Sequence, residues 1–332
     1  MASNNMQLAA IEPGIDVVKS QKLTWVNIEQ PNKQKMQYLA QHYSFHPLDL
    51  DDCLSEVHLQ KIGEHEDYVF IILHLPVFDQ RTRITTASQV AIFLGKGFLV
   101  TVHSGDLKPL ANLLLRCQKD DKMCNEYLSK GSGYLMYRIL DALVDYCFPM
   151  VDKTLSNLTK IEDKVFDPKT NASQEVTILR RDIASQRRII RLAKIVIADL
   201  EQKVQRFAEV DLKVYFSDMN DHLNHLSNDI EECYETIDIY KDTTLALSQE
   251  RTNENQKRTN RIMAVLTILF TITLPATVFA TFFGMHVNIP GGSENGGWVG
   301  PLGTYTTFIV IALISFVSGA IMFLLFRRWH WI

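Results

Sequence analysis

Short motifs of the common catalytic classes are missing from this chain of 332 residues. It contains no glycine-rich phosphate-binding loop, no GxSxG nucleophile motif, no HExxH motif and no cysteine–histidine spacing typical of zinc sites. The five cysteines are scattered, odd in number and without a CxxC pair, which favours reduced thiols over a disulfide framework. We therefore expect neither an enzyme nor a bound cofactor.

Charged side chains are absent from residues 263–285 and from residues 302–326. A helix rises about 1.5 Å per residue, so each run of about 23 to 25 residues can cross a hydrocarbon core of about 30 Å. Backbone polar groups in lipid must be paired internally, and each run should therefore be a helix, the first one bent at Pro275. We predict two transmembrane helices; the alternative is a buried helical hairpin of a soluble domain.

Basic residues flank these two runs but are missing from the loop between them, whose one charged residue is Glu294. Lys257, Arg258 and Arg261 precede the first run, and Arg327 and Arg328 follow the second. Because positive residues concentrate on the cytoplasmic side of a membrane, we expect both termini in the cytoplasm. The prediction is a multi-pass protein of the cell (inner or plasma) membrane with a large cytoplasmic body.

The first part of that body alternates short apolar segments with helical ones, which indicates an α/β domain over residues 1–130. The expected strands are 23–28, 68–75, 89–94 and 98–102, with a hairpin turn at 95–97, and the expected helices are 36–43 and 107–117.

Long helices with few turn signals follow this domain. Apolar residues recur at a spacing of about 3.6 over residues 134–165, which predicts one helix with a possible kink at Pro149. After a break at 167–169, a second helix is expected over 175–207. We predict an antiparallel hairpin over 131–210, followed by a stalk helix over 211–261 that continues into the first span at 262–285. An external loop at 286–301, the second span at 302–326 and a basic tail at 327–332 complete the predicted organisation.

One face of the stalk and first span is uncharged at heptad spacing. It comprises Gln249, Asn253, Gln256, Asn260, Met263, Thr267, Phe270, Leu274, Thr277 and Thr281. Amides in such a seam are costly unless they line water, so several copies around an axis would make this stripe a pore wall. The alternative is a solvated polar face followed by ordinary lipid-facing residues.

A hairpin of two helices cannot enclose a pore by itself, so conduction requires a homo-oligomer in which each lining residue becomes a ring. Rings of amide and hydroxyl oxygens suit a cation that retains much of its hydration shell, as Mg²⁺ does. Rings of apolar side chains can close a pore by dewetting. The predicted gate comprises Asn260, Met263, Thr267, Phe270 and Leu274.

Several motifs in order give the chain a resemblance to the CorA metal-ion transporters. They are an HPLxLED-like segment at 46–54, a strand motif at 89–94, DALVD at 141–145, LPxT at 274–277, FGM at 283–285 and a basic-aromatic tail at 327–329. The resemblance implies a funnel-shaped homopentamer in the lipid bilayer, with an α/β cytoplasmic domain, a long helical stalk and a pore built from the first span. It implies divalent cations as transported substrates and partners, and no nucleic acid.

The signature at the pore mouth departs from the family pattern. The family has Gly-Met-Asn, or Gly-Val-Asn in the zinc-transporting ZntB branch, whereas this chain has Gly284, Met285 and His286. Imidazole suits Zn²⁺, Ni²⁺ and Cu²⁺ better than Mg²⁺, although Asn288 could supply the missing amide. We expect the selectivity residues to be Gly284, Met285, His286, Asn288, Thr277 and Thr281.

The regulatory metal site of the family is also altered. The resemblance places the sensing carboxylate of the HPLxLED-like segment at Asp52, beside Asp51, and matches its partner on the long helix to Gln249, next to Glu250. Loss of one carboxylate weakens an oxygen-preferring site, so feedback inhibition by Mg²⁺ is predicted to be weak or absent.

Other polar residues give weaker signals. His222 and His225 with Asp218 and Asp221 have helical metal-site spacing, for which a solvated face is the alternative. The acidic pairs Asp141/Asp145 and Glu231/Glu232 are expected on the surface, and His74 and His103 are expected as core or rim residues.

Three functions remain open from the sequence. The first is a Mg²⁺ influx channel, with Co²⁺ and Ni²⁺, driven by the membrane potential. The second is a transporter of Zn²⁺ or another transition metal in which His286 contributes selectivity. The third is a membrane-anchored sensor that does not transport.

Overall fold

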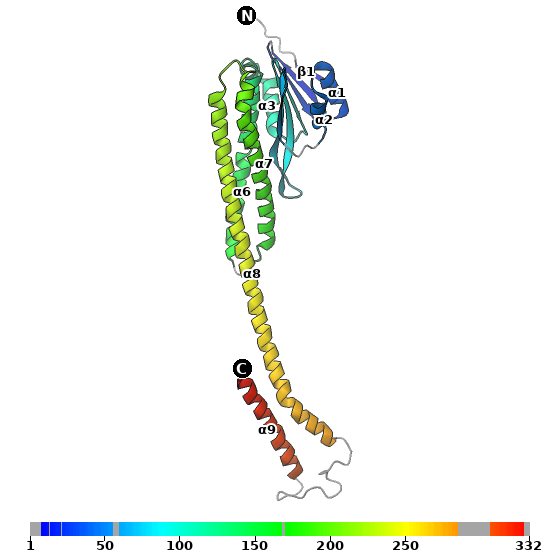
Figure 1. Ribbon diagram of the computed structural model, residues 1–332, viewed down its shortest axis with the longest axis vertical. Coiled ribbons are helices and arrows are strands. Elements are labelled where there is room, and N and C mark those ends of the chain that lie inside the picture. Colours follow the sequence, from blue (N-terminus) through cyan, green and yellow to red (C-terminus); the bar gives the residue numbers. More distant parts are fainter. Residues whose placement is uncertain are drawn as a thin grey trace. The chain divides into compact units, whose positions relative to one another are not determined.

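The computed structural model describes residues 8–12, 14–20, 22–55, 60–167, 170–284 and 306–328. The chain divides into two units, Met1–Leu245 and Ala246–Ile332. The division falls inside one long helix, α8 (Lys213–Gly284), which begins in the first unit and ends in the second (Figure 1).

A seven-stranded sheet forms the centre of the first unit. Its strands are β1 (Leu8–Glu12), β2 (Ile15–Lys19), β3 (Thr24–Glu29), β4 (Lys61–Glu64), β5 (Tyr68–Asp79), β6 (Ile84–Gly95) and β7 (Phe98–His103). They lie in the order β1-β2-β3-β7-β6-β5-β4. The β3–β7 pair is parallel and the other neighbouring pairs are antiparallel.

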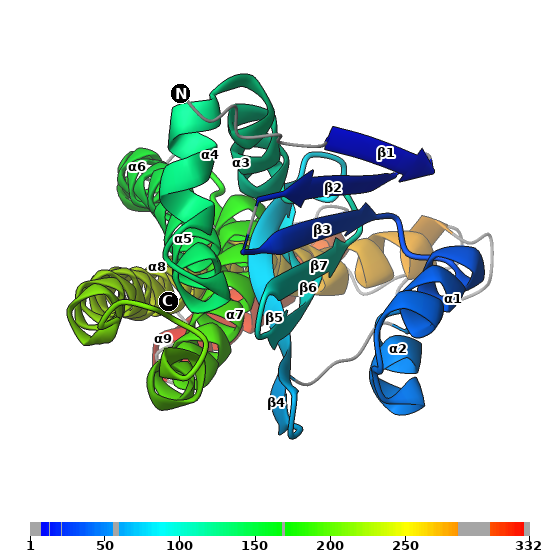
Figure 2. The same ribbon diagram turned by 90° about the horizontal axis from the view of Figure 1, so that it is seen from above.

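Both faces of the central strands are covered, which explains their nearly continuous apolar sequence. Along β5, Val69 and Ile71 belong to one core cluster, whereas Phe70 and Ile72 belong to the cluster on the opposite face. Helices α1 (Lys33–His42) and α2 (Pro47–Asp52) lie on one side of the sheet (Figure 2). The other side is covered by α3 (Lys108–Lys119), α4 (Asp121–Leu128), α5 (Ser132–Asp145) and α7 (Ser173–Gln205).

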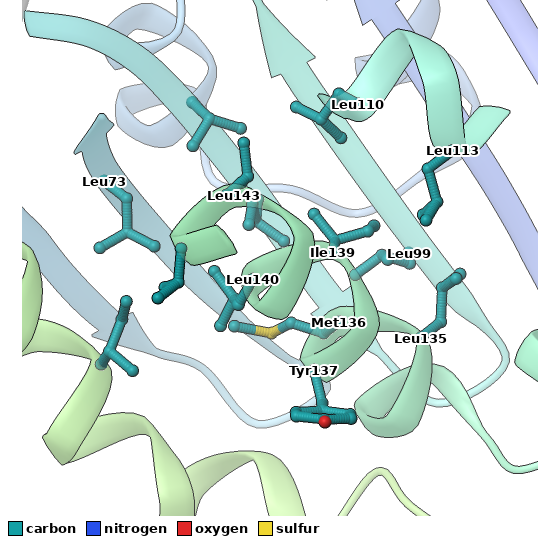
Figure 3. Close-up of a cluster of buried hydrophobic side chains, with 14 of the residues drawn as sticks. Leu73, Leu99, Leu110, Leu113, Leu135, Met136, Tyr137, Ile139, Leu140 and Leu143 are labelled. Carbon is teal, nitrogen blue, oxygen red and sulfur yellow. The ribbon is translucent and has the colours of Figure 1, made fainter. Parts of the chain in front are cut away.

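The larger core lies between the sheet and the helices α3 (Lys108–Lys119), α4 (Asp121–Leu128) and α5 (Ser132–Asp145). In Figure 3, Leu140 and Leu143 of α5 point toward the sheet side chain Leu73, and Ile139 lies close to Leu99. This packing holds α5 in a fixed position on the sheet, and α5 carries Asp141 and Asp145, two of the possible metal ligands described below.

A helical bundle continues from this core and includes α6 (Phe148–Phe166), α7 (Ser173–Gln205) and the first part of α8. Its apolar seam contains Leu158 from α6, Ile183 from α7 and Ile237 from α8. Arg187 Nε lies 2.5 Å from Glu231 Oε2, and this ion pair joins α7 to α8. Helix α6 ends at Phe166 and the chain returns as α7, with Lys164 Nζ lying 2.6 Å from Glu175 Oε2 across the connection.

Most elements expected from the sequence are present. The four predicted strands are β3, β5, β6 and β7, the two predicted helices of this part are α1 and α3, and the predicted turn joins β6 to β7. Gly97 in that turn has φ of 84°, a left-handed conformation that a residue without a Cβ adopts at no steric cost. The α/β class of the first unit is therefore confirmed.

One expected helix is wrong. Residues 134–165 form two helices, α5 and α6, separated at Tyr146 and Cys147. Pro149 lies in the first turn of α6, where its missing N–H group would have had no helical partner. Pro149 therefore marks the start of a new helix and not a kink within one helix.

Five short elements were not expected: β1, β2, β4, α2 and α4. None exceeds eight residues, as α4 has 8 and α2 has 6. Apolar periodicity needs a longer window to become visible, so these segments gave no clear signal.

The second unit contains the end of α8 and the helix α9 (Thr306–Arg328). The predicted uninterrupted rod is confirmed, because α8 is a single helix of 72 residues with Pro275 inside it. In the part of the chain that the structure describes, α8 is the one helix long and apolar enough to cross a membrane; its most apolar window has a mean hydropathy of 1.8 and none of it is buried. A Cβ on Gly319 of α9 would lie 3.7 Å from Ile272 of α8, so a small residue lies where these two helices approach.

Candidate ion pathway and metal-binding residues

Threonine hydroxyls recur along the second-unit part of α8 and donate to its own backbone. Thr267 donates to the carbonyl of Met263 at 2.8 Å, and Thr277 donates to the carbonyl of Thr273 at 2.8 Å. Thr281 donates to the carbonyl of Val278 at 2.9 Å. Each hydroxyl has therefore used its hydrogen, and the lone pairs that remain on its oxygen are acceptors, which suit a cation.

The apolar residues of the predicted gate are exposed in the single chain. Met263 is 62% exposed, Phe270 is 68% exposed and Leu274 is 60% exposed. Val265 and Leu269, on other sides of the same helix, are also exposed. Apolar side chains therefore face outward on all sides of this helix and must be shielded from water, which lipid and further copies of the chain can do.

The predicted selectivity residues fall partly outside the described residues. Thr277 and Thr281 lie exposed on α8, and Gly284 is the last residue of that helix. Met285, His286 and Asn288 lie outside the described residues, so their role stays a prediction. Asn260 is exposed on α8, as the last amide of the uncharged stripe before Met263.

The predicted regulatory carboxylate Asp52 has a cation beside it. Asp52 Oδ2 forms an ion pair with Lys61 Nζ, joining the end of α2 to β4, and Gln89 Nε2 donates to the carbonyl of Asp52 at 3.1 Å. Asp51 is exposed on α2. Glu250 is exposed on α8 and belongs to the second unit. A divalent ion would have to compete with the Lys61 ammonium for Asp52.

Beside this segment lies a buried carboxylate that sequence reasoning missed. Asp49 Oδ2 accepts from the hydroxyl of Tyr68 at 2.9 Å and lies 2.8 Å from His65 Nε2. Burial, reinforced by the Asp49 carboxylate, raises the pKa of Tyr68 to about 12. These contacts hold α2 on the sheet. They could not be predicted from local sequence patterns, because Asp49 and Tyr68 are 19 residues apart.

A cluster of three possible metal ligands lies on α5 and α8. Asp141, Asp145 and His222 can each offer one ligand atom, and these atoms lie within 4.8 Å of one another. Burial and the neighbouring Asp145 raise the pKa of Asp141 above its ordinary value, and Arg138 Nη1 lies 3.1 Å from Asp141 Oδ2. Two carboxylate oxygens and an imidazole suit Co²⁺, Ni²⁺ or Zn²⁺.

This cluster differs from the two predicted groups. His225 does not join His222 but pairs with Asp229 at 2.8 Å, and Asp218 and Asp221 are not members of the cluster. Asp141 and Asp145, expected merely as surface residues, are the partners of His222. Helical spacing identified His222 as a candidate, but the carboxylates that meet it come from another helix.

His103 is a core residue, as expected. Gly105 N donates to its Nδ1 at 3.1 Å, which leaves the Nε2 hydrogen to be donated to Asn27 Oδ1 at 3.1 Å. Burial disfavours the imidazolium and lowers the pKa of His103 to about 4. The residue is therefore neutral at physiological pH, and both of its ring nitrogens have protein partners.

Comparisons with known proteins define the class of protein that carries these features. A family model described as "CorA-like Mg2+ transporter protein" matches residues 20–328. The chain belongs to this family of membrane transporters of divalent metal ions, which are not enzymes.

Individual relatives agree with this assignment. The chain is 31% identical over 302 residues to YfjQ of Bacillus subtilis, assigned to metal ion transport without a named ion, with 88% of each protein covered. It is 25% identical to the cobalt/magnesium transport protein CorA of Thermotoga maritima, over 93% of this chain and 83% of that protein.

A solved structure shows the same fold. The complete structure of the CorA magnesium transporter from Methanocaldococcus jannaschii superimposes with a TM-score of 0.58 at 20% sequence identity, covering 95% of this chain and 93% of that one. At this identity the likeness concerns the α/β domain and the long helix.

Proposed function

We propose that this chain is one subunit of a homopentameric channel that admits divalent cations into the cytoplasm, chiefly Mg²⁺ together with Co²⁺ and Ni²⁺. The pore is formed by five copies of α8, with α9 as the second span outside it and both termini in the cytoplasm. The observation that carries the proposal is the row of threonine oxygens along α8, whose hydrogens are used by the helix. A row of acceptors stabilises a cation and not an anion.

The uncovered surface of α8 supports the oligomer. Thr267, Thr277 and Thr281 share the uncharged stripe with the exposed gate residues Met263 and Leu274. One copy leaves the remaining lone pairs of the threonine oxygens facing lipid, where nothing donates to them, whereas a closed ring places them around water. The apolar residues on the same stripe then form constrictions that close by dewetting.

The membrane potential supplies the driving force. One elementary charge crossing about 100 mV gains about 2.3 kcal/mol, so a divalent cation gains roughly 4 to 5 kcal/mol on entering a negative interior. Influx needs no nucleotide, in agreement with the missing phosphate-binding motif.

Flux into liposomes tests the proposal. Purified full-length protein should admit Mg²⁺ and Co²⁺, and Thr277→Val should reduce the flux because the isosteric side chain removes an oxygen from each subunit. Thr271→Val is the matched control, since Thr271 lies on the same helix beside the stripe and its hydroxyl also donates to the backbone, at 2.6 Å. Equal loss in both variants, or none in either, contradicts a pore lined by the stripe.

A second candidate function is transport of Zn²⁺ or another transition metal, favoured by His286 in place of the family asparagine. Zn²⁺ uptake that disappears in His286→Asn, together with Mg²⁺ uptake that appears in it, would select this alternative. Absence of uptake of Mg²⁺, Co²⁺ and Zn²⁺ would instead identify a sensor that does not transport.

A further inference from the structure

Two buried cysteines meet at the corner between α3 and α4. Asp120 ends α3, because its N–H group donates to the carbonyl of Arg116 at 3.0 Å. The same residue begins α4, because its side chain accepts from Lys122 N at 2.9 Å and from Met123 N at 3.2 Å. A single residue thus turns the chain between two helices.

This tight corner brings the thiols of Cys117 and Cys124 into contact. Both residues are 0% exposed and belong to the core between the sheet and the helices. Their side chains hydrogen-bond to each other, which, together with burial, holds the pKa of Cys117 well above its ordinary value. The resting pair is therefore a neutral dithiol.

The other cysteines have different neighbours. Cys53 Sγ donates to the backbone carbonyl of Asp49 at 3.2 Å, and Cys147 Sγ donates to that of Leu143 at 3.3 Å. Cys233 lies in the separate apolar seam of the helical bundle. These three buried cysteines are internal controls for the pair, because they share its burial but not its thiol–thiol contact.

We propose that Cys117 and Cys124 are a redox modification site, a dithiol that a hydroperoxide converts into an intramolecular disulfide across the α3–α4 corner. One sulfur attacks the peroxide oxygen and becomes a sulfenic acid, with release of water or alcohol. The second thiol then displaces water from it and forms the S–S bond. Two thiols and one hydrogen peroxide molecule give one disulfide and two water molecules, so the pair is oxidised by two electrons and the peroxide is reduced by two.

The surroundings favour this product over stepwise oxidation of a single sulfur. A disulfide is uncharged and apolar, so it leaves no charge in a core lined by groups such as Leu113 and Leu128. A sulfinate would bury a charge there. Because the thiolate is the attacking form, and burial disfavours it, the reaction proceeds when the short α3–α4 corner opens locally.

The crosslink joins two helices that both pack on α5, the helix that carries Asp141 and Asp145. Oxidation therefore stiffens the support of α5. We expect slower amide hydrogen exchange in α3 and α4 after oxidation, reversed by a thiol reductant.

Peptide mapping of the full-length protein in detergent tests the proposal. The protein is treated with hydrogen peroxide, the peroxide is removed, and the protein is then unfolded in the presence of an alkylating reagent, which reaches all five buried cysteines, and digested. The expected result is a crosslinked Cys117–Cys124 peptide, two fewer alkylated thiols, and Cys53, Cys147 and Cys233 still alkylated. Recovery of Cys117 and Cys124 as thiols or as sulfinic acids, while other cysteines react equally or faster, overturns it.

Single-cysteine variants separate the site from general oxidation. In Cys117→Ala and in Cys124→Ala, peroxide should leave hydrogen exchange in α3 and α4 unchanged, and the remaining thiol should form no disulfide within the chain. If a variant fails to fold by circular dichroism, the wild-type mapping still decides the question. Exchange that slows equally in wild type and in a folded variant contradicts the crosslink.

Discussion

Asp182 accepts a hydrogen bond from the backbone N–H of Thr85 at 2.5 Å, although the two residues are 97 positions apart. Asp182 is buried on α7 and Thr85 is buried at the start of β6. Gln186 Nε2 donates to the second carboxylate oxygen of Asp182 at 2.9 Å. The carboxylate thus attaches the helical bundle to the sheet.

Asp182→Ala should destabilise the first unit. The substitution leaves the Thr85 N–H group buried without an acceptor, which costs about 1 to 3 kcal/mol, and the lost bond to Gln186 adds to this. Thermal unfolding of the full-length protein in detergent, followed by circular dichroism, should show a lower midpoint. Asp199→Asn is the control, because Asp199 is an exposed carboxylate on the same helix, paired with Lys203. Equal midpoints for Asp182→Ala and wild type would remove Asp182 from this role.

Acid should destabilise the protein through His103. The pKa of His103 is about 4 in the native protein, below the value of about 6.5 expected in the unfolded chain. Between these two pH values the unfolded state therefore binds a proton that the native state does not bind. The contribution to stability is present above pH of about 6.5 and is lost progressively as the pH falls toward 4, by up to about 3 kcal/mol. Urea unfolding of wild type and His103→Gln at several pH values measures the difference.

The His103→Gln curve should depend less steeply on pH, because glutamine can donate to Asn27 without titrating. His42→Gln serves as the control, since His42 is exposed on α1. Parallel curves for wild type and His103→Gln over this range would show that another group causes the acid sensitivity.

Feedback inhibition by cytoplasmic Mg²⁺ is expected to be weak, because Lys61 already neutralises Asp52. Lys61→Gln should make Mg²⁺ flux more sensitive to internal Mg²⁺ in liposomes, since the ion no longer competes with an ammonium group. Lys96→Gln makes the same charge change at an exposed turn and should have no effect. Steep shut-off in wild type that Asp52→Ala abolishes would contradict this expectation.

The cluster of Asp141, Asp145 and His222 should bind Co²⁺. Removing a ligand in Asp145→Asn or His222→Gln should weaken binding by at least about tenfold, since loss of even a supporting group costs that much. Co²⁺ absorption spectra of the full-length protein report both affinity and ligand type. His225→Gln is the control on the same helix, because His225 pairs with Asp229 outside the cluster. A spectrum unchanged in His222→Gln would exclude the imidazole as a ligand.

The sequence alone determined the features that depend on local patterns. The apolar run around Val69 and Ile71 predicted a buried strand, and the absence of Pro and Gly between Val214 and Pro275 predicted the continuous helix α8. Motif order predicted the transporter family. These signals lie within a few turns or strand residues of one another, where side-chain periodicity and backbone restrictions act directly.

Only the tertiary structure decided which distant groups meet. The pairing of His222 with Asp141 and Asp145, of Asp49 with His65, and of Asp182 with Thr85 depends on how helices pack on one sheet. Spacing on a single helix offered Asp218 and Asp221 as possible partners of His222, whereas the carboxylates of the cluster belong to α5, because a residue on a packed helix can contact side chains from its neighbour as readily as from its own next turn. Periodicity specifies the face of an element, and packing specifies what that face touches.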